Sequence, residues 1–526
     1  MKRLLSIFFI CLSITSLFTA CSKSLPKAQG IQVLDFRLGE GFMEENGIQV
    51  PYPLDGLLGI PEGDNNPVAF ILHGAHTITD VNESRYYLGF DYLVEALTKA
   101  GYLTLSININ RAFVSEPVEG VETERVFNIF KGYYELLEKA NAGEKIFAYD
   151  LTDKANLDQL NFIGHSRGGD NSLYISKLLK DAGDERVQSV LMVAPPQNIV
   201  LSETYVDLPT GIILPQYDGD VSTLDGATLF NYAYQLGIPR KHPIASAFLY
   251  GGNHAQFNTQ LPERDMLVFY EDVTYLPAQT QKDFLIQYAT DFLNTFNRSG
   301  VHSLETLGII QPTAYSTPFM PSLLMSEGYR LVMPTNLVEL SSAHYSMPSS
   351  NKMDVTYVTL SSFPEEDTAA PFNHPVGLHG SIPLYSLAWQ TPDATLTFSL
   401  DTQNLSNYKQ LALWIANDST HPYNDGNNPL ELEVILTDVK GLTASKVLSA
   451  TRDSALRYNP TPIINIHADI DGLDPYWKAQ HFTPLGTQFI PLTHFSGIDL
   501  TQITSITLKG LNPSGAVMLG GIDLYE

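Results

Sequence analysis

The stretch that decides the fold is LNFIGHSRGGDNSLYISKLLK, residues Leu160–Lys180. It begins with an apolar run, Leu160–Ile163, that is typical of a buried strand, and it ends with a helix-like run, Asn171–Lys180. Between them lies Gly164–Gly168, in which two glycines flank Ser166. A serine at such a sharp strand-to-helix turn has its hydroxyl raised above the sheet, and a Cβ on either flanking glycine would collide with the neighbouring strand or helix. The pattern therefore predicts that Ser166 is a nucleophile.

Apolar runs of strand length lie on both sides of this turn and alternate with helical stretches. The strand-like runs are Val68–Leu72, Tyr102–Ile107, Val187–Ala194, Gly211–Leu214 and Ala245–Tyr250. The helical stretches are Phe90–Ala100, Arg125–Ala140 and Gln281–Phe296. This alternation predicts an α/β fold with a mostly parallel sheet and flanking helices. We place this catalytic domain at residues 50–300.

The acid of a serine triad is expected next, because in this kind of sheet the catalytic residues follow in the order serine, acid, histidine. It should lie just beyond Gly211–Leu214, where the chain reads Asp218-Gly219-Asp220-Val221. Asp218 is favoured because a valine follows it three positions later, a spacing common after this strand. Asp220 stays open as the alternative acid.

His254 is the candidate base among the thirteen histidines of the chain. It follows the last predicted strand of the sheet, in the glycine-containing run Gly251-Gly252-Asn253-His254. An imidazole near its usual pKa can take the proton of Ser166 and return it to the leaving group. An aspartate would hold the tautomer of this ring and stabilise the imidazolium.

The oxyanion hole requires two N–H donors, and the residue after the nucleophile, Arg167, supplies one. The second is expected from the loop after Val68–Leu72, which reads His73-Gly74-Ala75-His76, with Ala75 as the donor. His73 is expected to brace this loop. Gly74, His76 and His165 are assigned to the pocket and its supporting loops.

The pattern of apolar and polar residues changes in the last third of the chain. Apolar residues alternate with polar ones, as at Leu396, Phe398 and Leu400, and turn clusters separate the strands. The pattern predicts an all-β sandwich of the jelly-roll kind at residues 349–526, after a linker at 301–348. Its tryptophans are either a stacking platform for sugars or core residues: Trp389, Trp414 and Trp477.

The first residues form a separate segment. Lys2 and Arg3 precede an apolar run that is too short to span a bilayer comfortably, and Phe18-Thr19-Ala20-Cys21 follows. This resembles the lipobox of bacterial lipoproteins, which implies a signal peptide at 1–20, lipidation of Cys21, membrane attachment and delivery to the outer membrane of the cell envelope. Residues 21–49 are then a tether and entry segment. Because Cys11 is the only other cysteine, no disulfide or thiol chemistry is expected in the mature protein.

The chain resembles secreted bacterial α/β-hydrolases near the chlorophyllase, platelet-activating-factor acetylhydrolase and polyester-hydrolase groups, with a carbohydrate-binding-type jelly roll. The resemblance lies in the runs Gly164–Gly169, Asp218–Val221, Gly252–His254, Ile490–Leu500 and Gly521–Leu524. One departure is that Pro215 and Gln216 stand where many relatives have glycine before the acid.

This resemblance implies hydrolysis of a small or polymeric carboxylic ester through an acyl-enzyme, without a metal or organic cofactor. A serine peptidase that uses the same triad is an alternative, and so is a surface protein that binds glycans or polymers on a hydrolase-like scaffold. The net charge of −26 argues against nucleic acid as a partner, because phosphate binding requires clustered cationic side chains.

Overall fold

The computed structural model describes residues 25–27, 30–117, 120–196, 205–222, 224–236, 240–265, 267–298, 308–325, 329–334, 348–360, 382–460, 462–466 and 483–526. The proposed signal peptide, Cys21 and Trp477 lie outside these residues, so the lipid anchor stays a prediction from sequence. In the part of the chain that the structure describes, no helix is long and apolar enough to span a bilayer.

A nine-stranded sheet dominates the described N-terminal part of the chain, with the strand order β1-β2-β4-β3-β5-β6-β7-β8-β10. Pairing is parallel from β4 through β8 and antiparallel at both edges. The strands are β1 (Gln32–Glu45), β2 (Ile48–Ile60), β3 (Asn66–Leu72), β4 (Leu103–Ile107), β5 (Ala155–His165), β6 (Val187–Val193), β7 (Thr210–Pro215), β8 (Ile244–Leu249) and β10 (Phe319–Leu324). The predicted mostly parallel sheet is therefore present.

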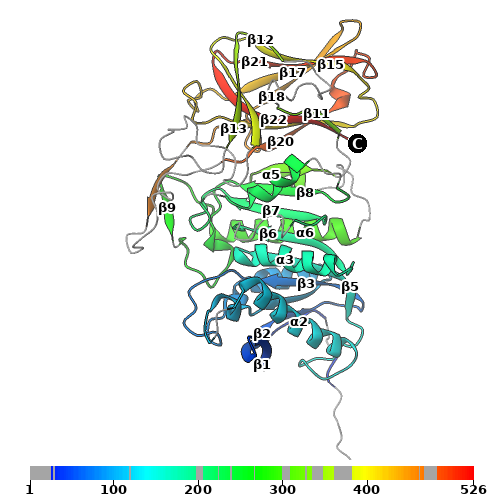
Figure 1. Ribbon diagram of the computed structural model, residues 1–526, viewed down its shortest axis with the longest axis vertical. Coiled ribbons are helices and arrows are strands. Elements are labelled where there is room, and N and C mark those ends of the chain that lie inside the picture. The colour runs from blue at the N-terminus through cyan, green and yellow to red at the C-terminus, as the bar shows by residue number, and fades with distance from the viewer. Residues whose placement is uncertain are drawn as a thin grey trace, which may run out of the picture.

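Helices cover both faces of this sheet (Figure 1). They are α1 (Asp91–Lys99), α2 (Glu122–Asn141), α3 (Arg167–Asp181), α5 (Ala227–Leu236) and α6 (Ala278–Arg298), with short 3₁₀ turns η1 (Tyr86–Phe90), η2 (Asn110–Phe113), η3 (Ala255–Phe257), η4 (Gly308–Ile310) and η5 (Pro312–Ala314). On one face Phe130 of α2 packs edge-on against Phe70 and Phe162 of the sheet. On the other face α1 and α6 enclose a second buried cluster that contains Ile71 and Phe292.

The C-terminal part contains two antiparallel sheets, of six and five described strands. One holds β11 (Tyr329–Val332), β13 (Met353–Leu360), β14 (Ile382–Trp389), β16 (Gln410–Asn417), β20 (Gly486–Pro491) and β22 (Gly515–Tyr525), and β20 is followed by the 3₁₀ turn η8 (Leu492–His494). The other holds β12 (Ser349–Asn351), β15 (Ala394–Gln403), β17 (Glu431–Asp438), β18 (Thr443–Ser449) and β21 (Ile503–Gly510). Every second residue of β17 is buried, which is the alternation that the sequence shows.

The two described tryptophans of this part are core residues rather than an exposed stacking platform. Trp389 is 1% exposed and donates its indole N–H to the carbonyl of Asn512 at 3.1 Å. Trp414 is 3% exposed and packs on Tyr234 of α5, with 4.0 Å between ring centroids. The second contact joins the β-domain to the α/β-domain, and Figure 1 shows the β-domain beyond the β8 end of the large sheet.

Two predicted boundaries were wrong. The large sheet begins at Gln32 rather than at residue 50, because β1 and β2 form a long hairpin at its edge. Half of the edge strand β1 faces solvent and carries charged residues, so its apolar pattern is weak. The predicted linker at 301–348 contains β10, which pairs with β8, and β11, which pairs with β22. Their short apolar runs lie among Ser, Thr and Pro residues, so the sequence pattern did not identify them as strands.

One further pair of strands joins the two domains. β9 (Val268–Glu271), which follows the His254 loop, pairs antiparallel with β19 (Ile463–Ile466) of the β-domain. The two paired segments are almost two hundred residues apart in the chain, and no local sequence pattern predicts that they pair.

Candidate active site

The strand order brings three sequence-predicted residues to one edge of the sheet. Ser166 follows β5, Asp218 lies just beyond β7, and His254 lies just beyond β8. Since β5, β6, β7 and β8 are consecutive parallel neighbours, their carboxyl ends meet at the same edge. Two backbone hydrogen bonds also tie the Asp218 loop to the His254 loop, from Gln216 N to Leu249 O and from Tyr217 N to Gly252 O.

Ser166 has φ = 54° and ψ = −132°, at the N-terminus of α3. A positive φ on a non-glycine residue is strained, and such strain is concentrated at functional sites. The flanking glycines are required by close packing: a Cβ on Gly164 would lie 2.0 Å from the carbonyl oxygen of Gly168, and one on Gly168 would lie 2.4 Å from that of Leu72. The turn has the geometry expected for a nucleophile elbow, and Ser166 is 8% exposed.

Asp218, rather than Asp220, contacts His254. Its Oδ2 lies 3.0 Å from His254 Nδ1, and both side chains are 1% exposed. The other carboxylate oxygen of Asp218 accepts the N–H groups of Asp220 at 3.0 Å and Val221 at 2.6 Å, which fixes the carboxylate in place. The valine three positions beyond Asp218 therefore contributes its backbone N–H rather than its side chain.

The Asp220 side chain points elsewhere. Its Oδ1 accepts the N–H of Leu267 at 3.3 Å, and the residue lines the pocket above Ser166. Asp220 thus holds the segment that leads into β9 and places a second carboxylate near the imidazole without touching it.

The ionisation of His254 is controlled by opposing effects. Burial lowers the pKa of the imidazole, but the charge of Asp218 and its hydrogen bond outweigh burial, and Asp220 and Asp265 add to them. The net result is a His254 pKa raised to about 9. The imidazole is therefore protonated at neutral pH in the absence of substrate.

This shift predicts the pH dependence of a reaction in which His254 acts as the base. Only the neutral imidazole accepts a proton from Ser166, and its population increases as the pH rises through about 9. We therefore expect kcat/KM to rise from pH 7 to a plateau above about 9, well above the usual histidine pKa. The measurement is a pH profile of kcat/KM with a neutral ester; a plateau already reached at pH 7 would contradict it.

The His73 side chain is hydrogen-bonded on both ring nitrogens in the loop after β3. Backbone N–H of Ile109 donates to His73 Nε2 at 3.0 Å, so Nε2 has no proton, and Nδ1–H donates to the carbonyl of Gly74 at 2.8 Å. Burial lowers the pKa of this ring to about 4, in agreement with a neutral histidine. Gly74 brings the loop against Ser166, because a Cβ there would lie 2.6 Å from Ser166 Cβ.

A pocket of about 550 Å³ opens at Ser166. It is lined by Ala75, His76, Thr77, Ser166, Arg167, Pro196, Asp220, Val221, Asp225 and Leu267. Both predicted oxyanion donors, Ala75 and Arg167, thus border the same space as Ser166, while the Arg167 side chain is paired with Glu122 at 3.0 Å. Within the described chain, no hydrogen bond joins the Ser166 hydroxyl to His254; such bonds often tighten only when substrate binds.

Two neighbouring histidines are neutral. His165 lies with its ring centroid 4.7 Å from that of His254, and its Nε2–H donates to the His254 carbonyl at 3.0 Å. Burial lowers the pKa of His165 well below its usual range. Burial, and then electrostatic interaction with His73 and His254, also lower the pKa of His76 to about 2. His165 thus supports the His254 loop and His76 lines the pocket.

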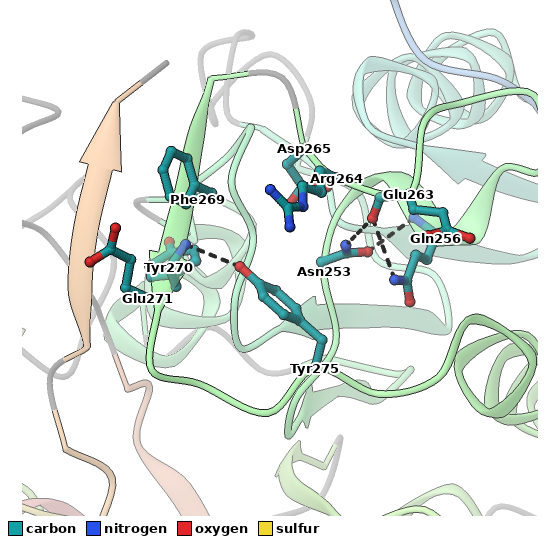
Figure 2. A pocket seen from close by; sticks show the side chains of 9 residues that line it. All are labelled: Asn253, Gln256, Glu263, Arg264, Asp265, Phe269, Tyr270, Glu271 and Tyr275. Atoms are coloured by element: carbon teal, nitrogen blue, oxygen red, sulfur yellow. Dashed lines mark hydrogen bonds between the residues drawn. The ribbon is translucent and has the colours of Figure 1, made fainter. Parts of the chain in front are cut away.

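The sequence did not identify Asp265 as part of the site. This residue is 5% exposed and lies in the wall of a second pocket of about 360 Å³, behind the histidine loop (Figure 2). Figure 2 also shows that Asn253, the residue before His254, donates its amide to the carbonyl of Glu263, at 3.0 Å. The segment around Asp265 therefore contacts the histidine loop directly. Among the described residues, no group of three or more His, Cys, Asp or Glu side chains is arranged to hold a metal ion.

Comparison with models of protein families gives no match, and comparison with curated proteins gives none. Among solved structures the chain is similar to a dienelactone hydrolase from Anabaena variabilis, at 16% identity and a TM-score of 0.32. The match covers 51% of this chain and 100% of that one. A similarity this weak carries no weight for activity or substrate, so the chemistry rests on the geometry of the site itself.

Proposed function

We propose that this chain is a serine hydrolase of the α/β-hydrolase type that cleaves carboxylic esters through an acyl-enzyme. The observation that carries the proposal is the buried pair of His254 and Asp218, 3.0 Å apart, at the same edge of the sheet as a serine held at φ = 54° on a strand-to-helix turn. A buried carboxylate that orients an imidazole toward a serine is the arrangement that serine hydrolases share across unrelated folds, and the strained turn at that serine is typical of α/β-hydrolases.

In the proposed reaction the Ser166 oxygen attacks the ester carbonyl while His254 Nε2 accepts its proton. The N–H groups of Ala75 and Arg167 stabilise the oxyanion, and the protonated His254 then donates to the departing alcohol. Water enters, loses a proton to His254 and releases the acid. Asp218 holds the tautomer of the imidazole and stabilises the imidazolium at each step.

A panel of p-nitrophenyl esters of graded acyl length, run beside p-nitroanilides of single amino acids, tests this proposal. The pocket of about 550 Å³ is within the usual range for small-molecule sites, so turnover of short and medium acyl chains is expected. Absence of ester turnover at any chain length would contradict the proposal. Cleavage of the anilides in preference to the esters would favour a peptidase.

We also propose that the β-domain braces the catalytic loops. Gln216, two residues before the acid, accepts the Gly251 N–H with its Oε1 at 2.8 Å and donates its Nε2 to the side chain of Asn459 in the β-domain. The Arg457 guanidinium lies 4.0 Å from the ring centroid of Tyr250, at the end of β8. One polar side chain of the β-domain thus reaches, through Gln216, the loops that carry both Asp218 and His254.

Substitution of Asn459 by alanine tests the brace. It leaves the buried Gln216 amide without its acceptor, which costs about 1–3 kcal/mol. We expect a lower Tm together with a lower kcat toward p-nitrophenyl esters. Asn428→Ala, at an exposed position of the same domain, is the control and should leave both unchanged. An Asn459→Ala protein with the Tm and kcat of the wild type would contradict the bracing role, and retention of the protein on a polysaccharide would instead favour a binding role.

A further inference from the structure

The Asp265 carboxylate accepts three backbone N–H groups from two different catalytic loops. Its Oδ2 accepts the N–H of Gly219 at 2.6 Å and that of His254 at 3.0 Å, and its Oδ1 accepts the N–H of Ala255 at 2.7 Å. Gly219 directly follows the acid Asp218, and His254 is the base itself. A single buried side chain therefore binds the backbone on both sides of the His254–Asp218 contact.

The chemistry of the three bonds requires a carboxylate. Both oxygens of Asp265 act as acceptors, and an ionised carboxylate has only acceptors to offer. An asparagine of the same shape has one oxygen and one NH₂ group. Its NH₂ group is a donor, so at least one of the three backbone N–H groups would lose its acceptor. Bonds from backbone N–H groups to a charged oxygen are also about twice as strong as neutral ones.

The sequence around the acid fits this role. A Cβ on Gly219 would lie 2.6 Å from Asp265 Cβ and 2.2 Å from the carbonyl oxygen of Val268, so the close approach of the two segments requires glycine there. The same segments are held again by the Val268 N–H, which donates to the Gly219 carbonyl at 2.9 Å, and by the Tyr270 hydroxyl, which donates to the Asp218 carbonyl at 2.8 Å.

We propose that Asp265 is a positioning residue of the catalytic site, which ties the acid loop to the histidine loop and so sets the contact between Asp218 and His254. The inference rests on the proposed function and adds a residue to it. Asp265 is not among the described residues that line the pocket at Ser166, and it acts through the backbone N–H groups that it accepts.

Asp265 also acts on the imidazole through its charge. Burial, and then the charge of Asp218, raise the pKa of the Asp265 carboxyl to about 7, so Asp265 is ionised at the higher pH where His254 titrates. Loss of this negative charge is therefore expected to lower the pKa of His254. Other titratable groups near Asp265 are Asp218 and Asp220 of the acid loop, His254, Glu263 and Arg264 of its own segment, Tyr270 and Glu271 of β9, and Tyr275 beyond it.

The test compares Asp265→Asn with Asp272→Asn, an exposed position just beyond β9 that serves as the matched control. Two quantities are measured on the full-length protein: the pH profile of kcat/KM with a p-nitrophenyl ester, and the pKa of His254 by NMR of ¹⁵N-histidine-labelled protein, assigned with His254→Gln. For Asp265→Asn we expect kcat/KM to fall by about 10²-fold, the loss that a small displacement of catalytic groups produces. The pKa of His254 should also fall, whereas Asp272→Asn should change neither.

Asp265→Glu keeps the charge and displaces the carboxylate by one methylene. It should recover a higher His254 pKa and more activity than Asp265→Asn, and it gives the readout if the asparagine variant does not fold. If a folded Asp265→Asn protein has the kcat/KM and the His254 pKa of the wild type, the inference about Asp265 is overturned, but the proposed function is not. A wild-type protein without esterase activity would overturn the proposed function, and the NMR measurement would still decide whether Asp265 controls His254.

Discussion

Replacement of Ser166 by alanine is expected to lower kcat/KM for p-nitrophenyl esters by about 10⁴-fold or more, since loss of the nucleophile alone removes most of the catalysis by a serine triad. The φ of 54° at Ser166 is tolerated by alanine no better than by serine, so stability should change little while activity is lost. The assay is the initial rate of p-nitrophenol release at a pH above 9, where His254 is neutral.

Ser176→Ala is the matched control for this variant. Ser176 lies on the same helix, α3, and its hydroxyl donates to the carbonyl of Ser172 at 2.7 Å, away from the turn. We expect it to keep the wild-type rate. A Ser166→Ala protein with a rate close to that of Ser176→Ala would show that the nucleophile is another group.

The second large effect is expected at the acid. In Asp218→Asn the side-chain oxygen would stay with the N–H groups of Asp220 and Val221, so its NH₂ group would face His254 Nδ1. This arrangement favours the imidazole tautomer with its proton on Nε2, which cannot accept the proton of Ser166. The corresponding change in a serine protease triad lowers kcat by about 10⁴-fold, and we expect a loss of that size.

Asp220→Asn separates the two aspartates that the sequence left open. The amide oxygen can still accept the N–H of Leu267, and Asp220 makes no hydrogen bond with His254 in the described chain. The expected result is a small change in kcat with a lower apparent pKa in the pH profile, because one negative charge near His254 is lost. A loss for Asp220→Asn as large as that for Asp218→Asn would contradict the assignment of the acid.

Most of the parallel sheet and the strand-to-helix turn at Ser166 could be predicted because both depend on local pattern. The apolar runs that became β3–β8 are buried on both faces, so they read as unbroken hydrophobic segments. Ser166 is marked by two glycines that close packing requires on either side. The positions of Asp218 and His254 then follow from the order of the strands.

The features that could not be predicted depend on tertiary contacts. β1 is half exposed, and β9 acquires its partner only when β19 of the β-domain reaches it. Asp265 follows no apolar strand and belongs to no motif, yet folding places its carboxylate against the N–H groups of Gly219 and Ala255. The one signal for it is Gly219, a glycine between the two candidate acids where a Cβ has no room.

Covalent labelling with a fluorophosphonate, followed by mass spectrometry of the tryptic peptides, is the most direct test of the central claim. The reagent phosphonylates only a serine activated by a neighbouring base. For the native protein we expect one modified residue, Ser166, with labelling abolished in Ser166→Ala and strongly slowed in His254→Gln. An unmodified native protein, or equal labelling of Ser166→Ala, would contradict the assignment of this site as that of a serine hydrolase.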